Sequence, residues 1–150
     1  MGESGEEVVT NLQAKGLVFL RYGVEDVIRM TEEPCPCGRT HDRATILGRT
    51  IWLIDIRGKK IMPIDIQRIF EEFPETAQAA FTILKKAESM AKLEIRASFD
   101  KNITTNPLRL KSQIEERIGR KLEIESEIEW IPYEQLPKQF AKIMRITELK

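Results

Sequence analysis

Residues 35–43 (CPCGRTHDR) contain both cysteines and the single histidine of the chain. Cys35, Cys37 and His41 are of the types that bind zinc, and structural zinc sites are almost always four-coordinate. These three side chains leave that set incomplete, and the chain has no further Cys or His to complete it. A cysteine nucleophile with His41 as its base also lacks a third group to orient the base. We therefore predict no metal here, but a turn shaped by proline and glycine that carries two reduced thiols.

The stretch over residues 48–67 (GRTIWLIDIRGKKIMPIDIQ) predicts a strand, a tight turn, a short second strand and a helix start. Residues 52–56 are β-branched and aromatic, Gly58 is free to adopt a positive φ, and Pro63 suits a first helical turn. This order resembles the opening of the small C-terminal domain of acyl-adenylate-forming ligases. Residues 35–43 closely resemble a loop of one branch, the phenylacetate–coenzyme A ligases. The chain is identified as similar to the C-terminal portion of such a ligase.

The resemblance implies which residues hold the nucleotide. Residues 20–30 (LRYGVEDVIRM) resemble the family's Arg-Tyr-Arg-Thr-Gly-Asp, whose Asp binds both ribose hydroxyls of the adenylate, and Asp26 matches it. A carboxylate suits that role because it accepts two hydrogen bonds at once. Arg49 matches an arginine that approaches the same ribose, just before the hinge of the small domain. The family usually has Asp or Lys at that hinge, where this chain has Ile51 beside Trp52, and the alternative for Asp26 is an acidic turn between strands.

The resemblance also implies a catalytic lysine. Residues 136–146 (LPKQFAKIMRI) resemble the family's final loop, Pro-Arg-Ser-x-Gly-Lys-x-x-Arg, and Lys142 and Arg145 keep its spacing. Lys142 would then bridge the acyl carboxylate and the phosphate oxygens during adenylation, placing positive charge where negative charge gathers. The alternative is a basic amphipathic tail whose lysines stay in water. The turn at Arg57 and Gly58 would face the thiol donor when the domain rotates.

Composition limits the partners and the compartment. The 24 Lys and Arg residues balance 24 Asp and Glu residues, so no global field favours nucleic acid or an anionic membrane, and we expect neither as a partner. No apolar run is long enough to span a bilayer, and the acidic start MGESGEE lacks the apolar core of a secretory signal. Two cysteines one residue apart are no disulfide framework, so we expect the reducing cytoplasm.

Residues 1–44 differ in character from the rest. Short β-type runs occur at 8–10, 17–20 and 27–30, with turn-forming residues between them. Three short strands are marginal alone and need a surface to pack on. We predict that residues 1–44 are the remnant of a larger β-subdomain that carries the Cys-Pro-Cys loop.

Two helices are predicted in the remainder. Apolar residues every three or four positions indicate a helix that starts at Pro63 and is stopped by Pro74. A second helix starts at Pro107, with Asn106 as its N-cap and Gly119 as its C-terminal stop.

The remaining patterns define a fold class for residues 45–150. We predict an α+β domain, a small antiparallel or mixed sheet with two helices on one face, in ferredoxin-like order. Besides the opening hairpin, strands are predicted over 78–84, 93–99 and 122–130, and a loop-like tail over 131–150.

The resemblance also implies the reaction of the full enzyme. In the full enzyme a carboxylate and ATP with Mg²⁺ give an acyl-adenylate, and coenzyme A then gives the thioester. The family's phosphate loop and acyl pocket lie in a large N-terminal domain, and no such phosphate loop occurs here. We therefore expect the isolated chain to bind none of these cofactors and not to turn over. The large domain, in the same chain or as a separate subunit, is the expected partner, with a homodimer as a further expectation. The alternatives are a degenerate, free-standing binding or regulatory module and the small subunit of a split ligase.

Overall fold

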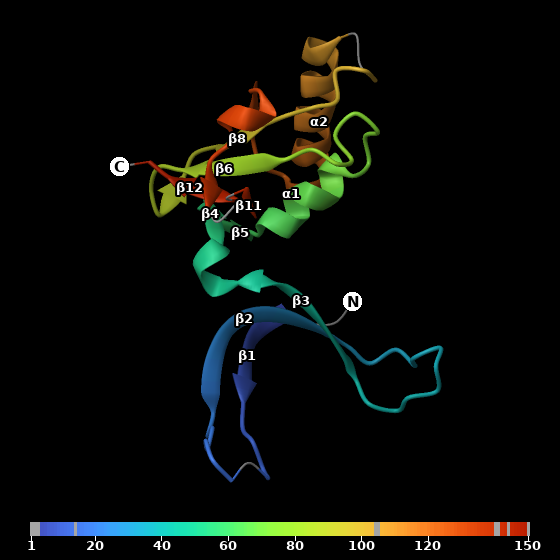
Figure 1. Ribbon diagram of the computed structural model, residues 1–150, viewed down its shortest axis with the longest axis vertical. Coiled ribbons are helices and arrows are strands. Elements are labelled where there is room, and N and C mark those ends of the chain that lie inside the picture. The colour runs from blue at the N-terminus through green and yellow to red at the C-terminus, as the bar shows by residue number, and fades with distance from the viewer. Residues whose placement is uncertain (1–3, 14, 104–105, 140–141, 144, 150) are drawn as a thin grey trace. The chain divides into compact units, whose positions relative to one another are not determined.

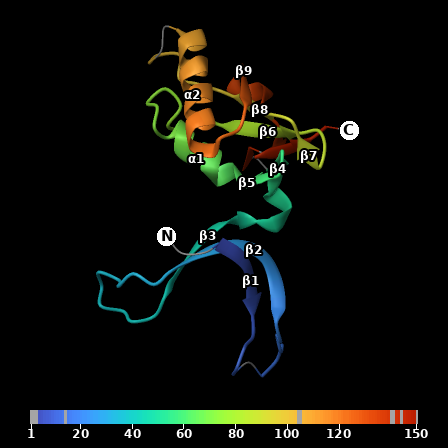
Figure 2. The same ribbon diagram turned by 180° about the vertical axis from the view of Figure 1, so that it is seen from behind.

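The computed structural model describes residues 4–13, 15–103, 106–139, 142–143 and 145–149, and it leaves the side chains of Gln139, Lys142 and Ile143 undescribed. The chain forms two compact units, Met1–Trp52 and Leu53–Lys150, whose elements Figures 1 and 2 show from two sides. Residues 45–52, which the sequence pattern assigns to the second domain, belong to the first unit. They do so because residues 45–49 complete a strand, β3 (Arg43–Arg49), that pairs with the strand before it.

The first unit is an antiparallel sheet in the order β1-β2-β3, with β1 at Ser4–Val9 and β2 at Tyr22–Thr31, followed by a 3-10 turn, η1 (Thr50–Trp52). The strand predicted over residues 17–20 is absent. The Asn11 amide donates to the Leu17 carbonyl at 2.9 Å, and its oxygen accepts from the Phe19 N–H at 3.0 Å. These backbone groups therefore bond to a side chain instead of a neighbouring strand.

The described residues of the first unit include none that is buried. Several large apolar side chains are open, among them Val18 and Leu20, which are 72% and 78% exposed. The first unit thus has backbone pairing but no apolar core of its own among the residues described.

The second unit is built on a mixed sheet in the order β12-β6-β8-β9. β6 and β8 are antiparallel, whereas β8–β9 and β12–β6 are parallel. A small sheet, β5-β4-β7, and a hairpin, β10-β11, complete the strands. Their bounds are β4 Ile54–Ile56, β5 Lys59–Ile61, β6 Phe81–Lys85, β7 Ser89–Met90, β8 Leu93–Ala97, β9 Ser126–Trp130, β10 Lys138–Gln139, β11 Lys142–Ile143 and β12 Ile146–Glu148, with a 3-10 turn η2 at Tyr133–Gln135.

Several of these strands differ from the expected pattern: β6 and β9 start later than residues 78 and 122, β7, β10, β11 and β12 were not predicted, and two cases show why. Trp52 was expected to begin a strand, but it lies in η1 and the strand starts at Ile54. The tail was expected to be loop-like, yet β12 pairs in parallel with β6, placing Ile146 opposite Ile83. A strand of three residues is too short to show a period in sequence, so its partner alone defines it.

The two helices begin where the sequence predicts. α1 spans Pro63–Phe70 and α2 spans Pro107–Leu122, each with proline in its first turn. The Asn106 side chain accepts the Arg109 N–H at 3.0 Å, as an N-cap does. Neither described helix is long and apolar enough to cross a membrane.

The predicted stop at Gly119 is wrong. α2 continues to Leu122 and is capped by Glu123, whose φ of 53° is left-handed. The Glu123 N–H donates back to the Gly119 carbonyl at 3.0 Å, so Gly119 takes part in the closing turn from inside the helix.

Both helices contribute to one apolar core. Ile66 of α1 and Ile114 of α2 are fully buried, and they share a cluster with alternate residues of β8. Between those buried positions, Glu94 and Arg96 are only partly covered, so this strand has one apolar and one wet face. The predicted fold class, α+β with a small mixed sheet and two helices, is confirmed.

Candidate functional site

Asp26 and Arg49 meet across the sheet of the first unit. They are directly opposed in the register of β2 and β3. The Arg49 Nε donates to Asp26 Oδ1 at 3.1 Å, and its Nη2 donates to the Val24 carbonyl at 3.1 Å. The Asp26 side chain is 30% exposed and that of Arg49 is 47% exposed. The structure therefore brings together the two residues that the sequence assigns to the ribose and leaves both accessible.

Arg57 and Gly58 form the two-residue turn between β4 and β5. Their φ values of 52° and 84° are both positive, as the tight hairpin turn that matches strand twist requires. The Asp55 carboxylate fixes this turn, because its Oδ1 accepts from the Gly58 N–H and from the Ser89 hydroxyl, each at 2.8 Å. These two hydrogen bonds, that from Gly58 first, lower the pKa of Asp55.

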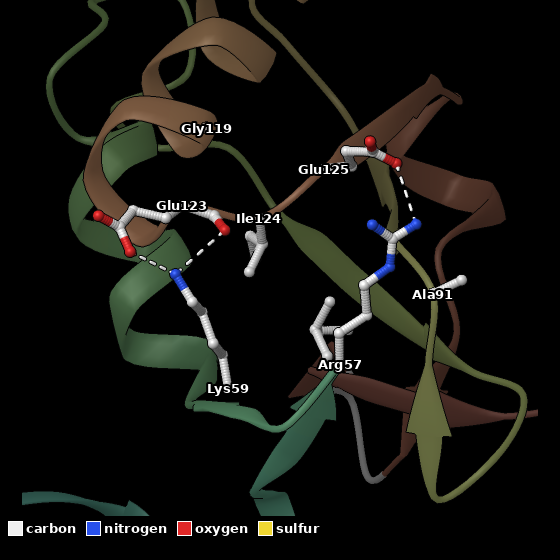
Figure 3. A pocket seen from close by; sticks show the side chains of 8 residues that line it. Arg57, Lys59, Ala91, Gly119, Glu123, Ile124 and Glu125 are labelled. Carbon is white, nitrogen blue, oxygen red and sulfur yellow. Dashed lines mark hydrogen bonds and ion pairs between the residues drawn. The ribbon is translucent and has the colours of Figure 1, made fainter.

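A pocket of about 420 Å³ lies beside this turn (Figure 3). On one side of it Arg57 reaches Glu125 at 3.6 Å, and on the other Lys59 pairs with the Glu123 carboxylate and donates to the Glu123 carbonyl at 3.3 Å. The hydrogen bond from Lys59 lowers the pKa of Glu123. Two cations thus face two carboxylates from the segment that joins α2 to β9.

These carboxylates were not singled out in the sequence. Glu123 and Glu125 belong to an alternating run of glutamates that typically marks the wet face of a strand. Their pairing with Arg57 and Lys59 depends on where α2 ends, and the sequence placed that end wrongly at Gly119.

Lys142 precedes Arg145, a residue that contacts β6 of the second unit. The backbone of Lys142 lies in β11, but its side chain is outside the described part of the chain. The Arg145 carbonyl accepts the Ile83 N–H at 2.8 Å, and its guanidinium lies 4.4 Å from the centre of the Phe81 ring. Burial lowers the pKa of Arg145. A residue three positions from Lys142 is therefore fixed to the sheet.

The loop of residues 32–42 brings the two thiols together. The Sγ atoms of Cys35 and Cys37 are 2.8 Å apart. Among the described residues, no three His, Cys, Asp or Glu side chains converge as metal ligands would. His41 therefore does not complete a metal site with the two thiols within that part of the chain.

The predicted site residues thus fall into two groups, one in each unit. Asp26 pairs with Arg49 in the first unit, and Arg57 with Gly58 makes one turn in the second. The functional roles of these residues remain predictions.

Comparison with known proteins identifies the domain type. Residues 58–150 match the family described as the AMP-binding enzyme C-terminal domain. The phenylacetate-coenzyme A ligase of Thermus thermophilus is 29% identical over 168 aligned positions. That alignment takes in 99% of this chain and 38% of the relative, so the chain spans less than two fifths of the relative's length. The resemblance predicted from the sequence is confirmed.

Solved structures show the same fold. A 2-hydroxyisobutyryl-CoA ligase in the postadenylation state, in complex with R3-HIB-AMP, has a TM-score of 0.84 at 21% identity, covering 99% of this chain and 32% of that one. A domain of a phenylacetate-coenzyme A ligase from Bacteroides vulgatus ATCC 8482 has a TM-score of 0.50 at 22% identity, covering 65% and 92%. At these identities the likeness concerns the fold alone.

Proposed function

The chain belongs to the AMP-binding enzyme C-terminal domain family, and from this premise we propose that it acts as the C-terminal portion of an acyl–coenzyme A ligase of the phenylacetate type. The reaction would join a carboxylate to the AMP part of ATP, with release of pyrophosphate. Attack by the thiol of coenzyme A on the acyl carbon would then release AMP and form the thioester. Mg²⁺ would accompany the nucleotide phosphates, as it usually does in such sites.

The observation that carries this proposal is the in-register pair of Asp26 and Arg49. The ion pair occupies one carboxylate oxygen of Asp26, and the side chain is open to solvent over about a third of its surface. An aspartate in this position fits a nucleotide ribose, because a carboxylate accepts hydrogen bonds from both neighbouring hydroxyls. Arg49 would orient that carboxylate through the Nε hydrogen bond while being tied to Val24 by Nη2.

The second unit would supply the two steps in turn. Lys142 would place its charge between the acyl carboxylate and the phosphate in the first step, where negative charge develops in the transition state. The turn of Arg57 and Gly58 would face the thiol donor in the second step. Arg57 has a left-handed backbone conformation that is strained for a residue with a long side chain. Such strain is typical of functional sites, which supports a role for Arg57.

The partner in this proposal is a large domain that binds the acyl group and most of ATP. The first unit has no buried residue among those described, and Val18 and Leu20 are open, so it would gain apolar cover from that domain. A second copy of the chain would provide cover of the same kind, and sedimentation at micromolar concentration distinguishes this homodimer from a monomer.

A second candidate is a free-standing, non-catalytic binding module or the small subunit of a split ligase. It is favoured by the end of the first unit, where Ile51 and Trp52 lie in a 3-10 turn, whereas the ligases usually carry Asp or Lys at the hinge. The neighbouring coding sequence distinguishes these forms. A large domain upstream in the same reading frame supports the C-terminal portion of a ligase, a large domain in a separate gene supports the split ligase, and neither supports the binding module.

The experiment uses a chimera in which this chain replaces the matched 38% of the Thermus thermophilus relative. We call it the ligase chimera, and the unaltered relative is its positive control. Asp26→Asn keeps an oxygen for Arg49 but removes the charge, so we expect the KM for ATP to rise about ten- to a hundredfold, the range for hydrogen bonds to charged groups.

Glu25→Gln, one residue away, is the matched control and should leave the KM for ATP unchanged. Equal KM values for the two variants would contradict the ribose-binding role of Asp26. The isolated chain should release no pyrophosphate from ATP and phenylacetate above a protein-free blank.

A further inference from the structure

The loop between β2 and β3 holds two thiols in contact. The Gly38 N–H donates to the Cys35 carbonyl at 2.9 Å, which closes a four-residue turn. Pro36 occupies the second position of that turn, where its fixed φ is favoured, and Gly38 takes a φ of 81° at the fourth. The backbone thereby brings the Sγ atoms of Cys35 and Cys37 within 2.8 Å of each other. No large backbone movement is needed to join them.

The two thiols differ in access and in acidity. Cys37 is exposed, whereas Cys35 is half-buried. Hydrogen bonds from the side chain and backbone of Cys37 lower the pKa of the Cys35 thiol, and the charge of Arg43 acts in the same direction against the effect of burial. Arg43, the first residue of β3, is tied to the loop because its Nη2 donates to the Glu33 carbonyl at 3.3 Å. The reactive species in disulfide exchange is the thiolate, which this environment favours at Cys35.

We propose that Cys35 and Cys37 form a redox-active dithiol that closes reversibly to an intrachain disulfide by exchange with a low-molecular-weight disulfide. In the first step Cys37, the more accessible of the two cysteines, loses its proton and attacks one sulfur of the oxidant, forming a mixed disulfide and releasing one thiolate. In the second, the Cys35 thiolate attacks Cys37 Sγ and displaces the second thiolate. The two cysteines lose two electrons and two protons, and the oxidant is reduced to two thiols.

The same geometry makes the bridge easy to reduce. It would span a single intervening residue, so it would remove little entropy from the unfolded chain and stabilise the fold little. It would also lie on an exposed loop, and exposed disulfides are the labile or regulatory ones. This inference does not depend on the ligase role of the chain.

The test incubates the reduced full chain with oxidised and reduced glutathione over a range of ratios. Intact and peptide masses are then measured after alkylation. We expect the unsubstituted chain to lose two hydrogens at oxidising ratios, with the loss mapped to the peptide of residues 35 and 37, and to regain them with dithiothreitol. Stable glutathione adducts, a chain that stays reduced, or crosslinks between chains would each overturn the proposal.

Two variants separate the steps and leave the strands untouched, since both positions lie in the loop. Cys35→Ser should stop at the mixed disulfide on Cys37, and that adduct should outlast the one on the unsubstituted chain by about tenfold or more, because closure within one chain has a high effective concentration. Pro36→Gly keeps both thiols but loosens the turn, so the mixed disulfide should accumulate before closure. Equal adduct lifetimes in Cys35→Ser and the unsubstituted chain would contradict the role of Cys35.

Discussion

Replacing Arg57 by asparagine should stabilise the second unit. Arg57 has a φ of 52° at the first position of the turn between β4 and β5. Side chains other than Asn, Asp and Gly cost about 1–2 kcal/mol in this region, because Cβ approaches the following carbonyl oxygen. Asn-Gly is the preferred pair for such a turn. Arg57→Asn would create that pair with Gly58, and we take the recovered strain as about 1 kcal/mol.

The substitution also removes an ion pair, which reduces the gain. Arg57 and Glu125 are 3.6 Å apart, and their side chains are 64% and 72% exposed. Exposed pairs of this kind contribute about 0–1 kcal/mol. The net stabilisation is therefore about 0.5 kcal/mol, which for a unit of this size raises Tm by about 2–4 °C.

Urea and thermal unfolding of the isolated chain measure this change. Trp130 is a suitable fluorescent reporter, because it packs against Phe99 in the second unit and its indole N–H donates to the Pro107 carbonyl at 3.0 Å. Arg57→Ala is the matched control: it loses the ion pair but keeps the strain, so its stability should not rise. An Arg57→Asn variant no more stable than Arg57→Ala would refute the strain argument.

Two further changes test the core and the surface of the same unit. Ile114→Ala removes a fully buried side chain from α2 and should cost about 2–5 kcal/mol, whereas Leu108→Ala, at a position 77% exposed on the same helix, should change the unfolding free energy little. The second change concerns Glu72, whose pKa is lowered by hydrogen bonds from Lys121 and then Arg117. Because the folded pKa lies below the unfolded value of 4.5, the stabilisation is present above about pH 4.5 and is lost as the pH falls through the folded pKa. Glu72→Gln should therefore flatten this part of the acid branch in a stability-against-pH curve, and an unchanged acid branch would contradict the assignment.

The sequence predicts the helix starts and the tight turn of the second unit well, because at each of them a single residue determines the backbone conformation. Gly58 has a positive φ, Pro63 and Pro107 open the helices, and Asn106 caps the second one. Each of these residues acts through its own ring, side chain or missing Cβ, so its effect is local and can be read from the sequence.

The sequence does not predict the local structure correctly where contacts with a distant part of the chain determine it. Glycine is the usual left-handed residue after a helix, but Gly119 stays helical and Glu123 takes that conformation, with Lys59 bonded to its carbonyl. β12 is a strand because it pairs in parallel with β6. These long-range contacts leave no periodic pattern in a short segment.

For the candidate site, too, the sequence predicts single residues but not the contacts between them. Asp26 and Arg49 are named separately by motif resemblance, and their direct opposition could not be read because nothing in the sequence marks β3 as a strand. Its residues 43–49 contain two arginines, a glycine and only partial alternation, a pattern too weak to predict a paired strand.

The half-reactions of the ligase chimera test the central proposal most directly. Lys142→Ala should slow acyl-adenylate formation by about a hundredfold or more, because it removes a charge directed at the transition state. Pyrophosphate exchange measures this step. Thioester formation from preformed acyl-adenylate and coenzyme A should fall far less, since Lys142 is needed in only one step. Lys138→Ala, at a nearby exposed lysine of β10, is the matched control and should affect neither step. Equal losses of both half-reactions in Lys142→Ala, or no loss of adenylation, would contradict the proposed role of this chain.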